Sequence, residues 1–120
     1  MHEFSIASAL VDQLQRIAAE QRATRIIAVE VHCGVMQQVV PEALRLAFEA
    51  TSTDTPAAGA TLTIVEEGLV ARCRACDVCY AAAIDDYACP RCRQADVELL
   101  AGRDIVLRTV TCETQDGVAV

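Results

Sequence analysis

The chain has 120 residues and a formal net charge of -7, and all ten of its basic residues are arginines. This length suits one modest core, or a small domain with a metal-stapled appendage. The acidic composition, with no Trp and only two Phe and two Tyr, argues against a nucleic-acid partner, which needs a basic surface and stacking rings. No basic leader precedes an apolar run and no apolar run reaches membrane-spanning length, so we expect a cytoplasmic protein without a membrane partner.

Residues 4–22 are predicted to form an amphipathic helix, because apolar side chains recur there at three- and four-residue spacing. Polar side chains fall mainly on the other side. The helix starts so early that Met1, His2 and Glu3 lie at its exposed N-terminus. We expect the apolar stripe to face the core, and it consists of Phe4, Ala7, Leu10, Val11, Leu14, Ile17 and Ala18.

A first strand is predicted over residues 24–33, which are rich in β-branched side chains and end at Gly34. Successive side chains of a strand point to opposite faces. One predicted face holds Ile27, Val29, Val31 and Cys33, and the other holds Ile26, Ala28, Glu30 and His32.

A second helix is predicted to open at Pro41, where a missing N–H costs nothing, and to run to about Thr51. Its buried face should contain Leu44, Ala47 and Phe48. A turn-rich loop over residues 51–59 leads to a strand over 60–66, and this order predicts a parallel right-handed crossover.

A third strand is predicted over residues 104–112, in the same sheet as the first two. The expected fold is α+β, with two helices packed on a three-stranded mixed sheet and an inserted zinc-ribbon domain. We expect residues 1–67 plus 102–120 to form the main α/β domain, with a loose tail after Glu113, and residues 68–101 to form the ribbon.

Two Cys-x-x-Cys pairs, Cys73-Arg-Ala-Cys76 and Cys89-Pro-Arg-Cys92, stand twelve residues apart. Two such pairs present four thiolates to one ion and are typical of a tetrahedral zinc site. The alternative is a disulfide framework, which the absence of any secretory feature argues against.

Cys79 makes the register of the first pair ambiguous, because Cys76-Asp-Val-Cys79 has the same spacing. The apolar strand Gly68-Leu-Val-Ala-Arg72 leads directly into Cys73, where such a turn begins. We therefore favour Cys73 and Cys76 as ligands and treat Cys79 as a spare thiol close to the metal.

The N-terminal triplet Met1-His2-Glu3 is a second candidate metal site. The amine of Met1 and the amide and imidazole of His2 lie close together, and Ni²⁺ or Cu²⁺ can bind such nitrogens in a plane. The Glu3 amide or carboxylate could complete the set, with Glu42 or water as other choices. Because an imidazole binds metal only when neutral, we expect nickel affinity to fall below about pH 6.5.

His32, Cys33 and Cys112 lie on predicted strands, where we expect structural roles. No catalytic triad, phosphate-binding glycine loop or paired catalytic carboxylates can be assembled from the sequence. The sequence therefore offers few residues for general acid–base or nucleophilic catalysis, and we do not expect an enzyme.

Taken together, the sequence resembles the HypA/HybF family of hydrogenase maturation factors. The resemblance covers residues 1 to about 112, and its N-terminal triplet combined with the cysteine quartet is specific. The matching features are Met1-His2-Glu3-Phe4-Ser5, Gly34, Pro41-Glu42-Ala43-Leu44, Ala47-Phe48-Glu49, Gly59-Ala60-x-Leu62, Cys73, Cys76, Cys89, Cys92 and the strand after Gly102.

The resemblance implies a nickel metallochaperone, not an enzyme, that helps insert Ni(II) into [NiFe]-hydrogenase. It implies nickel binding at Met1, His2 and Glu3, and structural zinc at Cys73, Cys76, Cys89 and Cys92. The implied partners are the maturation GTPase HypB and the hydrogenase large subunit, with a homodimer left open. Some relatives also serve urease.

Two other functions stay open at this point. One is a zinc-ribbon interaction or regulatory module without nickel delivery, which a gel shift with random DNA or RNA would test. The other is a thiol redox protein that uses Cys76 and Cys79, which would need a reactive thiol of low pKa.

Overall fold

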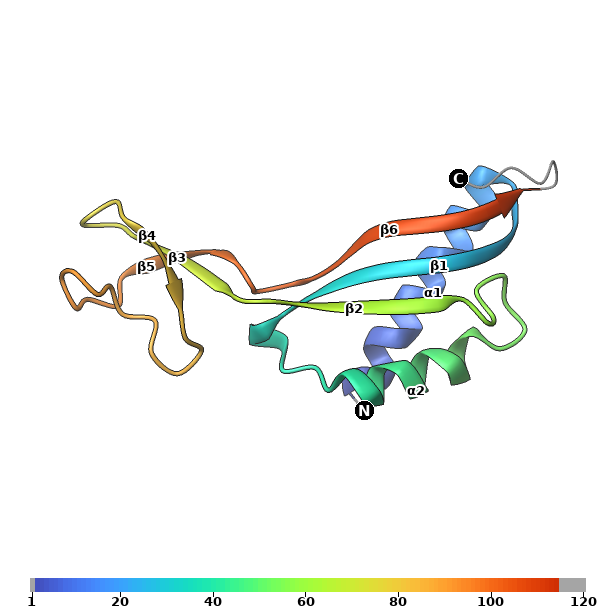
Figure 1. Cartoon of the computed structure of the whole chain (residues 1–120), viewed down its shortest axis with the longest axis horizontal. Coiled ribbons are helices and arrows are strands. Elements are labelled where there is room, and N and C mark those ends of the chain that lie inside the picture. The colour runs from blue at the N-terminus through green and yellow to red at the C-terminus, as the bar shows by residue number, and fades with distance from the viewer. Residues whose placement is uncertain (1, 115–120) are drawn as a thin grey trace. The chain divides into compact units, whose positions relative to one another are not determined.

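A computed structural model describes residues 2–114, which form two helices, a short 3₁₀ turn and six strands (Figure 1). The predicted roles of Met1 and of the C-terminal tail beyond Thr114 lie outside these residues. Within them, neither helix is long and apolar enough to span a membrane.

Helix α1 (His2–Gln21) buries the face that the periodicity predicts, with Ala7, Leu10, Val11, Leu14 and Ala18 all in the core. Two members of the predicted stripe differ. Ile17 is half-buried, and Phe4 is 45% exposed, so its assignment to the core was wrong. Phe4 lies on the predicted side of the helix, but it belongs to the first turn, which extends beyond the buried core.

Helix α2 (Pro41–Ser52) begins with Pro41 in its first turn and buries Leu44, Ala47 and Phe48, as predicted. It packs against α1. The side chain of Arg45 donates a hydrogen bond to the carbonyl of Leu62 on the following strand. The apolar faces of α1 and α2 therefore pack into one hydrophobic core.

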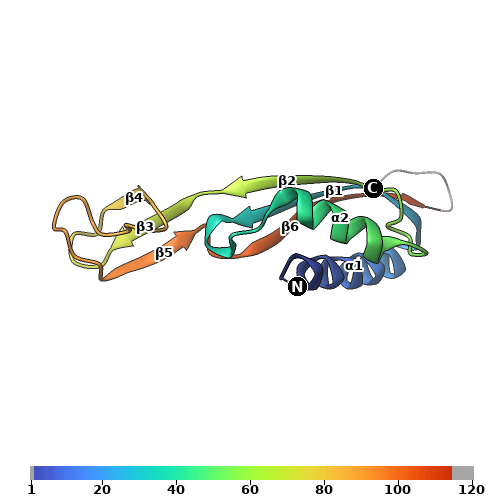
Figure 2. The ribbon, with the colours of Figure 1, turned by 90° about the horizontal axis from the view of Figure 1, so that it is seen from below.

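The main sheet has the order β2-β1-β6, from β1 (Ala23–Gly34), β2 (Thr61–Glu67) and β6 (Ile105–Thr114). Strands β1 and β2 run in the same direction and β6 runs opposite to them, so the sheet is mixed, as predicted (Figure 1). Helices α1 and α2 lie on one face of it (Figure 2).

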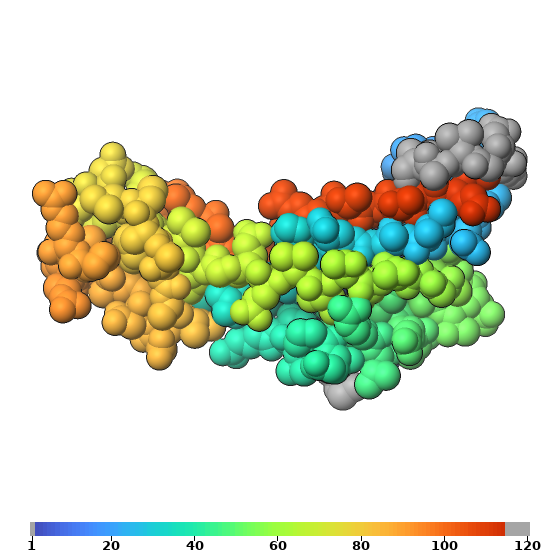
Figure 3. All heavy atoms as spheres, in the orientation of Figure 1, coloured from blue at the N-terminus to red at the C-terminus, as the bar shows by residue number. Residues whose placement is uncertain are grey.

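Among residues 2–114, no helix covers the other face of the main sheet, and β6, β1 and β2 lie side by side at the surface (Figure 3). A shallow hollow of about 200 Å³ on the sheet is lined by small and polar side chains, including Thr63, Thr109 and Thr111. This composition is compatible with contact to water.

Burial along β1 departs from simple alternation at the start of the strand. Val29, Val31 and Cys33 of one predicted face are buried and Ile27 of that face is half-buried, whereas Ile26 of the other face is 1% exposed. The N–H of Ile26 donates to the carbonyl of Pro56 at 2.8 Å, outside the sheet. The burial pattern therefore shifts by one residue between Ile26 and Val29.

The second sheet is antiparallel and has the order β4-β3-β5, from β3 (Leu69–Cys73), β4 (Cys79–Ala82) and β5 (Val97–Ala101). A bulge interrupts the β3–β5 register between Val70 and Ala71. The apolar strand that was expected to lead into Cys73 is β3. Leu69, Ala71 and Cys73 are its buried residues.

By their contacts, the described residues group into two compact units. One holds residues 2–31, 39–64 and 107–114, and the other holds 32–38 and 65–106. The domain division at residues 68 and 101 stays a prediction.

Candidate metal sites

The first cysteine turn follows directly from β3. The N–H of Cys73 donates to the carbonyl of Val78 at 3.0 Å, and the N–H of Asp77 donates to the carbonyl of Cys73 at 2.8 Å. Asp77 adopts a left-handed conformation with φ of 57°. The strand thus ends in a tight turn that presents both sulfurs on one side.

The second cysteine turn repeats this geometry residue for residue. The N–H of Cys89 donates to the carbonyl of Gln94 at 2.9 Å, and the N–H of Arg93 donates to the carbonyl of Cys89 at 2.8 Å. Arg93 takes the left-handed position, with φ of 66°. The two Cys-x-x-Cys pairs are therefore two copies of one turn.

The four sulfurs of Cys73, Cys76, Cys89 and Cys92 all lie within 4.8 Å of one another. Cys73 Sγ and Cys92 Sγ are 3.6 Å apart. Zinc–sulfur bonds of about 2.3 Å in a tetrahedron give sulfur–sulfur separations of about 3.8 Å. This donor set therefore fits a tetrahedral thiolate-bound metal ion.

Backbone amides already stabilise negative charge on these sulfurs. The N–H of Cys76 donates to Cys73 Sγ, and the N–H of Arg91 donates to Cys89 Sγ, both at 3.4 Å. The N–H groups of Cys92 and Arg91 lower the pKa of the Cys89 thiol to about 7.

The Cys76 and Cys92 thiols have a raised pKa in this cluster. A hydrogen bond with Cys92, together with burial and nearby Cys73, raises the pKa of the Cys76 thiol to about 12. Four thiolates this close repel one another, and a divalent cation would offset that repulsion. The cluster is built to hold a metal ion.

Cys79 is exposed and is not one of the clustered thiols. It begins β4, and the next residue, Tyr80, has its pKa raised by burial and by nearby Cys89 and Cys73. Tyr80 pairs with Ala71, which shares a face of β3 with Cys73, so Tyr80 lies on the side of the sulfurs. Because neighbouring residues in a strand point to opposite faces, Cys79 points away from them.

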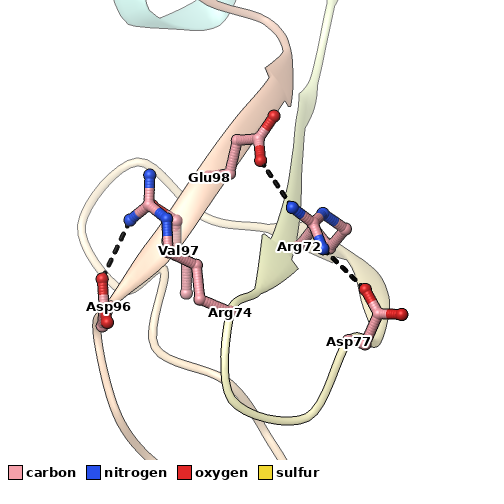
Figure 4. Close-up of polar contacts among 6 residues, drawn as sticks. All are labelled: Arg72, Arg74, Asp77, Asp96, Val97 and Glu98. Carbon is pink, nitrogen blue, oxygen red and sulfur yellow. Dashed lines mark hydrogen bonds and ion pairs between the residues drawn. The ribbon is translucent and has the colours of Figure 1, made fainter.

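Two arginines connect the first cysteine turn to β5 (Figure 4). Arg72 donates to Asp77 at 2.6 Å and to Glu98 at 2.7 Å. Arg74 donates to the carboxylate of Asp96 at 2.9 Å and to the carbonyl of Val97 at 3.1 Å. Ion pairing with Arg72 lowers the pKa of Glu98.

The second candidate site lies at the start of α1. The His2 side chain is 49% exposed, and its Nδ1 lies 3.5 Å from Glu3 Oε2. The same oxygen accepts a hydrogen bond from the N–H of Val40 at 3.2 Å. The N–H groups of Val40 and of Glu3 itself lower the pKa of the Glu3 carboxyl.

Two contacts were not predicted from the sequence. The Val40 contact with Glu3 uses a backbone N–H, which no side-chain pattern reveals. His32, which was expected to share a face with Glu30, has its Nδ1 3.5 Å from Glu67 Oε2. Glu67 belongs to a different strand, and only pairing of the strands brings it near.

The family model that matches the sequence is described as hydrogenase/urease nickel incorporation, metallochaperone, hypA, and the match spans residues 1–112. The hydrogenase maturation factor HypA of Chlorobium limicola is 38% identical over 116 residues, 97% of this chain and 100% of the relative. That of Chlorobaculum parvum is 34% identical over 113 residues, 94% of this chain and 100% of the relative.

Solved structures agree with these relatives. The solution structure of the Ni metallochaperone HypA from Helicobacter pylori matches with a TM-score of 0.73 and 25% identity. The match covers 96% of this chain and 100% of the solved chain.

Proposed function

This chain belongs to the HypA family of hydrogenase/urease nickel-incorporation metallochaperones, and we propose that it binds Ni(II) at its N-terminus and helps insert it into [NiFe]-hydrogenase. The protein is a maturation factor rather than a catalyst. The observation that carries the N-terminal assignment is the accessible His2 imidazole at the first residue of α1.

The proposed nickel donors are the Met1 amine, the His2 amide and imidazole, and Glu3. The first N–H groups of a helix have no partner within it, so the His2 amide is not needed to hold α1 together. A half-exposed ligand on a chain terminus suits cargo that must be released. Met1 lies outside the described residues and enters the set by the family resemblance.

The proposed resident metal is a structural Zn(II) held by Cys73, Cys76, Cys89 and Cys92. The sulfur separations and the amide hydrogen bonds to sulfur support this assignment. A bound zinc would supply the positive charge that four clustered thiolates require, and its binding would be coupled to folding of the ribbon. The permanently bound structural zinc and the transiently bound nickel would then use separate ligands.

The proposed partners are the maturation GTPase HypB, which handles nickel, and the large subunit of [NiFe]-hydrogenase. We place the protein in the cytoplasm, where nickel insertion and reduced thiols are compatible. A nucleic-acid partner is disfavoured by the net charge of -7.

The test is a nickel titration of zinc-loaded protein with its native N-terminus, beside His2→Ala. The matched control is His32→Ala, which removes the other histidine. We expect wild type and His32→Ala to bind one Ni(II), and His2→Ala to bind it much more weakly, with zinc retained by all three. Equal nickel binding by His2→Ala and wild type would reject the N-terminal site.

A further inference from the structure

The Glu3 carboxylate connects the starts of both helices. It belongs to the first turn of α1, and its Oε2 accepts the N–H of Val40 at 3.2 Å. Val40 is the N-cap of α2 and offers no side-chain cap of its own. The carboxylate on α1 therefore supplies an acceptor at the start of α2.

The electrostatics of this position favour a fixed anion. Helix N-termini carry partial positive charge, and both α1 and α2 begin beside Glu3.

The side chains of Glu3 and His2 differ in their exposure to solvent. The Glu3 side chain is 19% exposed, whereas the neighbouring His2 side chain is 49% exposed. A ligand that gives up its ion to a partner protein must be reachable, which His2 is and Glu3 is much less. Direct ligation through Oε2 would also take that oxygen from the N–H of Val40.

We propose that the Glu3 carboxylate is a positioning group that anchors the first turn of α1 to the Val40 N–H, and that it is not itself a nickel donor. The inference rests on the proposed N-terminal nickel site. Glu3 contributes its backbone amide to that site, while its side chain fixes the direction of the first turn and orients the His2 ring, 3.5 Å away.

The test separates a positioning role from ligation with matched substitutions. Glu3→Gln keeps an acceptor for Val40 but loses the carboxylate, whereas Glu3→Ala loses both. Val40→Pro removes the donor, at a φ of Val40, -89°, that lies about 10° beyond the usual proline range. Val40→Ala keeps the N–H and is its control.

We expect Val40→Pro and Glu3→Ala to weaken nickel binding by about 10- to 100-fold, the range for groups that orient a metal ligand. Glu3→Gln and Val40→Ala should stay within about threefold of wild type, with the same absorption spectrum of bound nickel. Wild-type affinity in Val40→Pro would overturn the proposal. So would an equal loss and a changed spectrum in Glu3→Gln.

A measurement without nickel keeps this test independent of the proposed function. Amide hydrogen exchange at Val40 should be slow in wild type and Glu3→Gln, and faster in Glu3→Ala, in zinc-loaded protein with unchanged helix content. Unchanged protection in Glu3→Ala would overturn the anchor itself. Failure of wild type to bind nickel, with the anchor intact, would instead reject the N-terminal nickel site.

Discussion

Gly34 and Gly102 pack backbone against backbone, so closely that a Cβ on Gly34 would lie 2.4 Å from the carbonyl carbon and oxygen of Gly102. Hydrogen bonds hold the two segments in this contact. The N–H of Gly34 donates to the carbonyl of Asp104 at 2.8 Å, and the N–H of Met36 donates to that of Gly102 at 3.0 Å. No side chain fits between them.

Gly34→Ala should therefore destabilise the protein by about 1–3 kcal/mol, the usual cost of forcing extra atoms into a packed site. The backbone of Gly34 is extended, with φ of -63° and ψ of 138°, so the effect would come from the clash and not from backbone strain. The measurement is the free energy of unfolding in denaturant. Gly68→Ala is the control, because nothing lies within 4 Å of its added Cβ. Equal stability of both variants would show that the backbone at Gly102 can shift to accommodate the added Cβ.

Gly102→Ala should cost more than Gly59→Ala, although both glycines have positive φ, 87° and 77°. Alanine is strained at either position. At Gly102 its Cβ would also lie 2.6 Å from the carbonyl oxygen of Gly68, whereas the space at Gly59 is open. We expect Gly59→Ala to lose about 1 kcal/mol and Gly102→Ala roughly 1–3 kcal/mol beyond that. Thermal melting of the zinc-loaded variants measures the order, and a larger loss at Gly59 would contradict it.

The sequence predicted best those features that local spacing determines. Helical periodicity identified five buried residues of α1, and two Cys-x-x-Cys pairs identified the four sulfurs that gather. Each signal lies within a few residues of chain, because one turn of helix or one cysteine turn is a local structure. Phe4 shows what periodicity cannot predict. The spacing identifies which face of a helix is buried, but not how far along the helix the burial extends.

Features that depend on distant segments could not be predicted. The N–H of Ile26 donates to the carbonyl of Pro56, thirty residues away, and the carboxylate of Glu3 accepts from the N–H of Val40. Cys79 was ambiguous for a related reason. Its spacing to Cys76 fits a ligand, but the pairing of β4 with β3 turns it away from the sulfurs.

Leu44→Ala should destabilise the protein by about 2–5 kcal/mol, because it removes a buried side chain from the face of α2 that lies in the core. Leu44 is fully buried, whereas Leu46, two residues along the same helix, is 68% exposed. Leu46→Ala is the matched control and should change stability by less than about 0.5 kcal/mol. Denaturant unfolding followed by circular dichroism gives both values. Similar losses in the two variants would mean that α2 does not bury this face.

The ion pair of Arg72 with Glu98 should make stability depend on acid pH in a defined direction. The folded-state pKa of Glu98 lies below its ordinary value of 4.5, so its contribution is present above that value and is lost as the pH falls through the folded-state pKa. The difference in unfolding free energy between wild type and Glu98→Gln should be constant near neutral pH and shrink below about pH 4.5. Asp85→Asn is the control for removing an exposed carboxylate. Loss of metal at low pH affects every variant and cancels in the difference, so a difference that grows on acidification would contradict the pairing.

Cys73→Ser should bind zinc about a hundredfold more weakly while Cys79→Ser keeps the wild-type affinity, because the two possible Cys-x-x-Cys registers share Cys76 and differ only in these two thiols. Structural zinc sites contribute roughly 12 kcal/mol, so loss of one ligand in four should cost about 3 kcal/mol, or about a hundredfold in affinity. Competition with a chromophoric chelator measures this, and alkylation of the zinc-loaded protein should label exposed Cys79 before the clustered thiols. If Cys79→Ser weakened zinc binding and Cys73→Ser did not, the alternative register of Cys76 with Cys79 would hold, and β4 would have to rotate to bring Cys79 to the face that Tyr80 occupies.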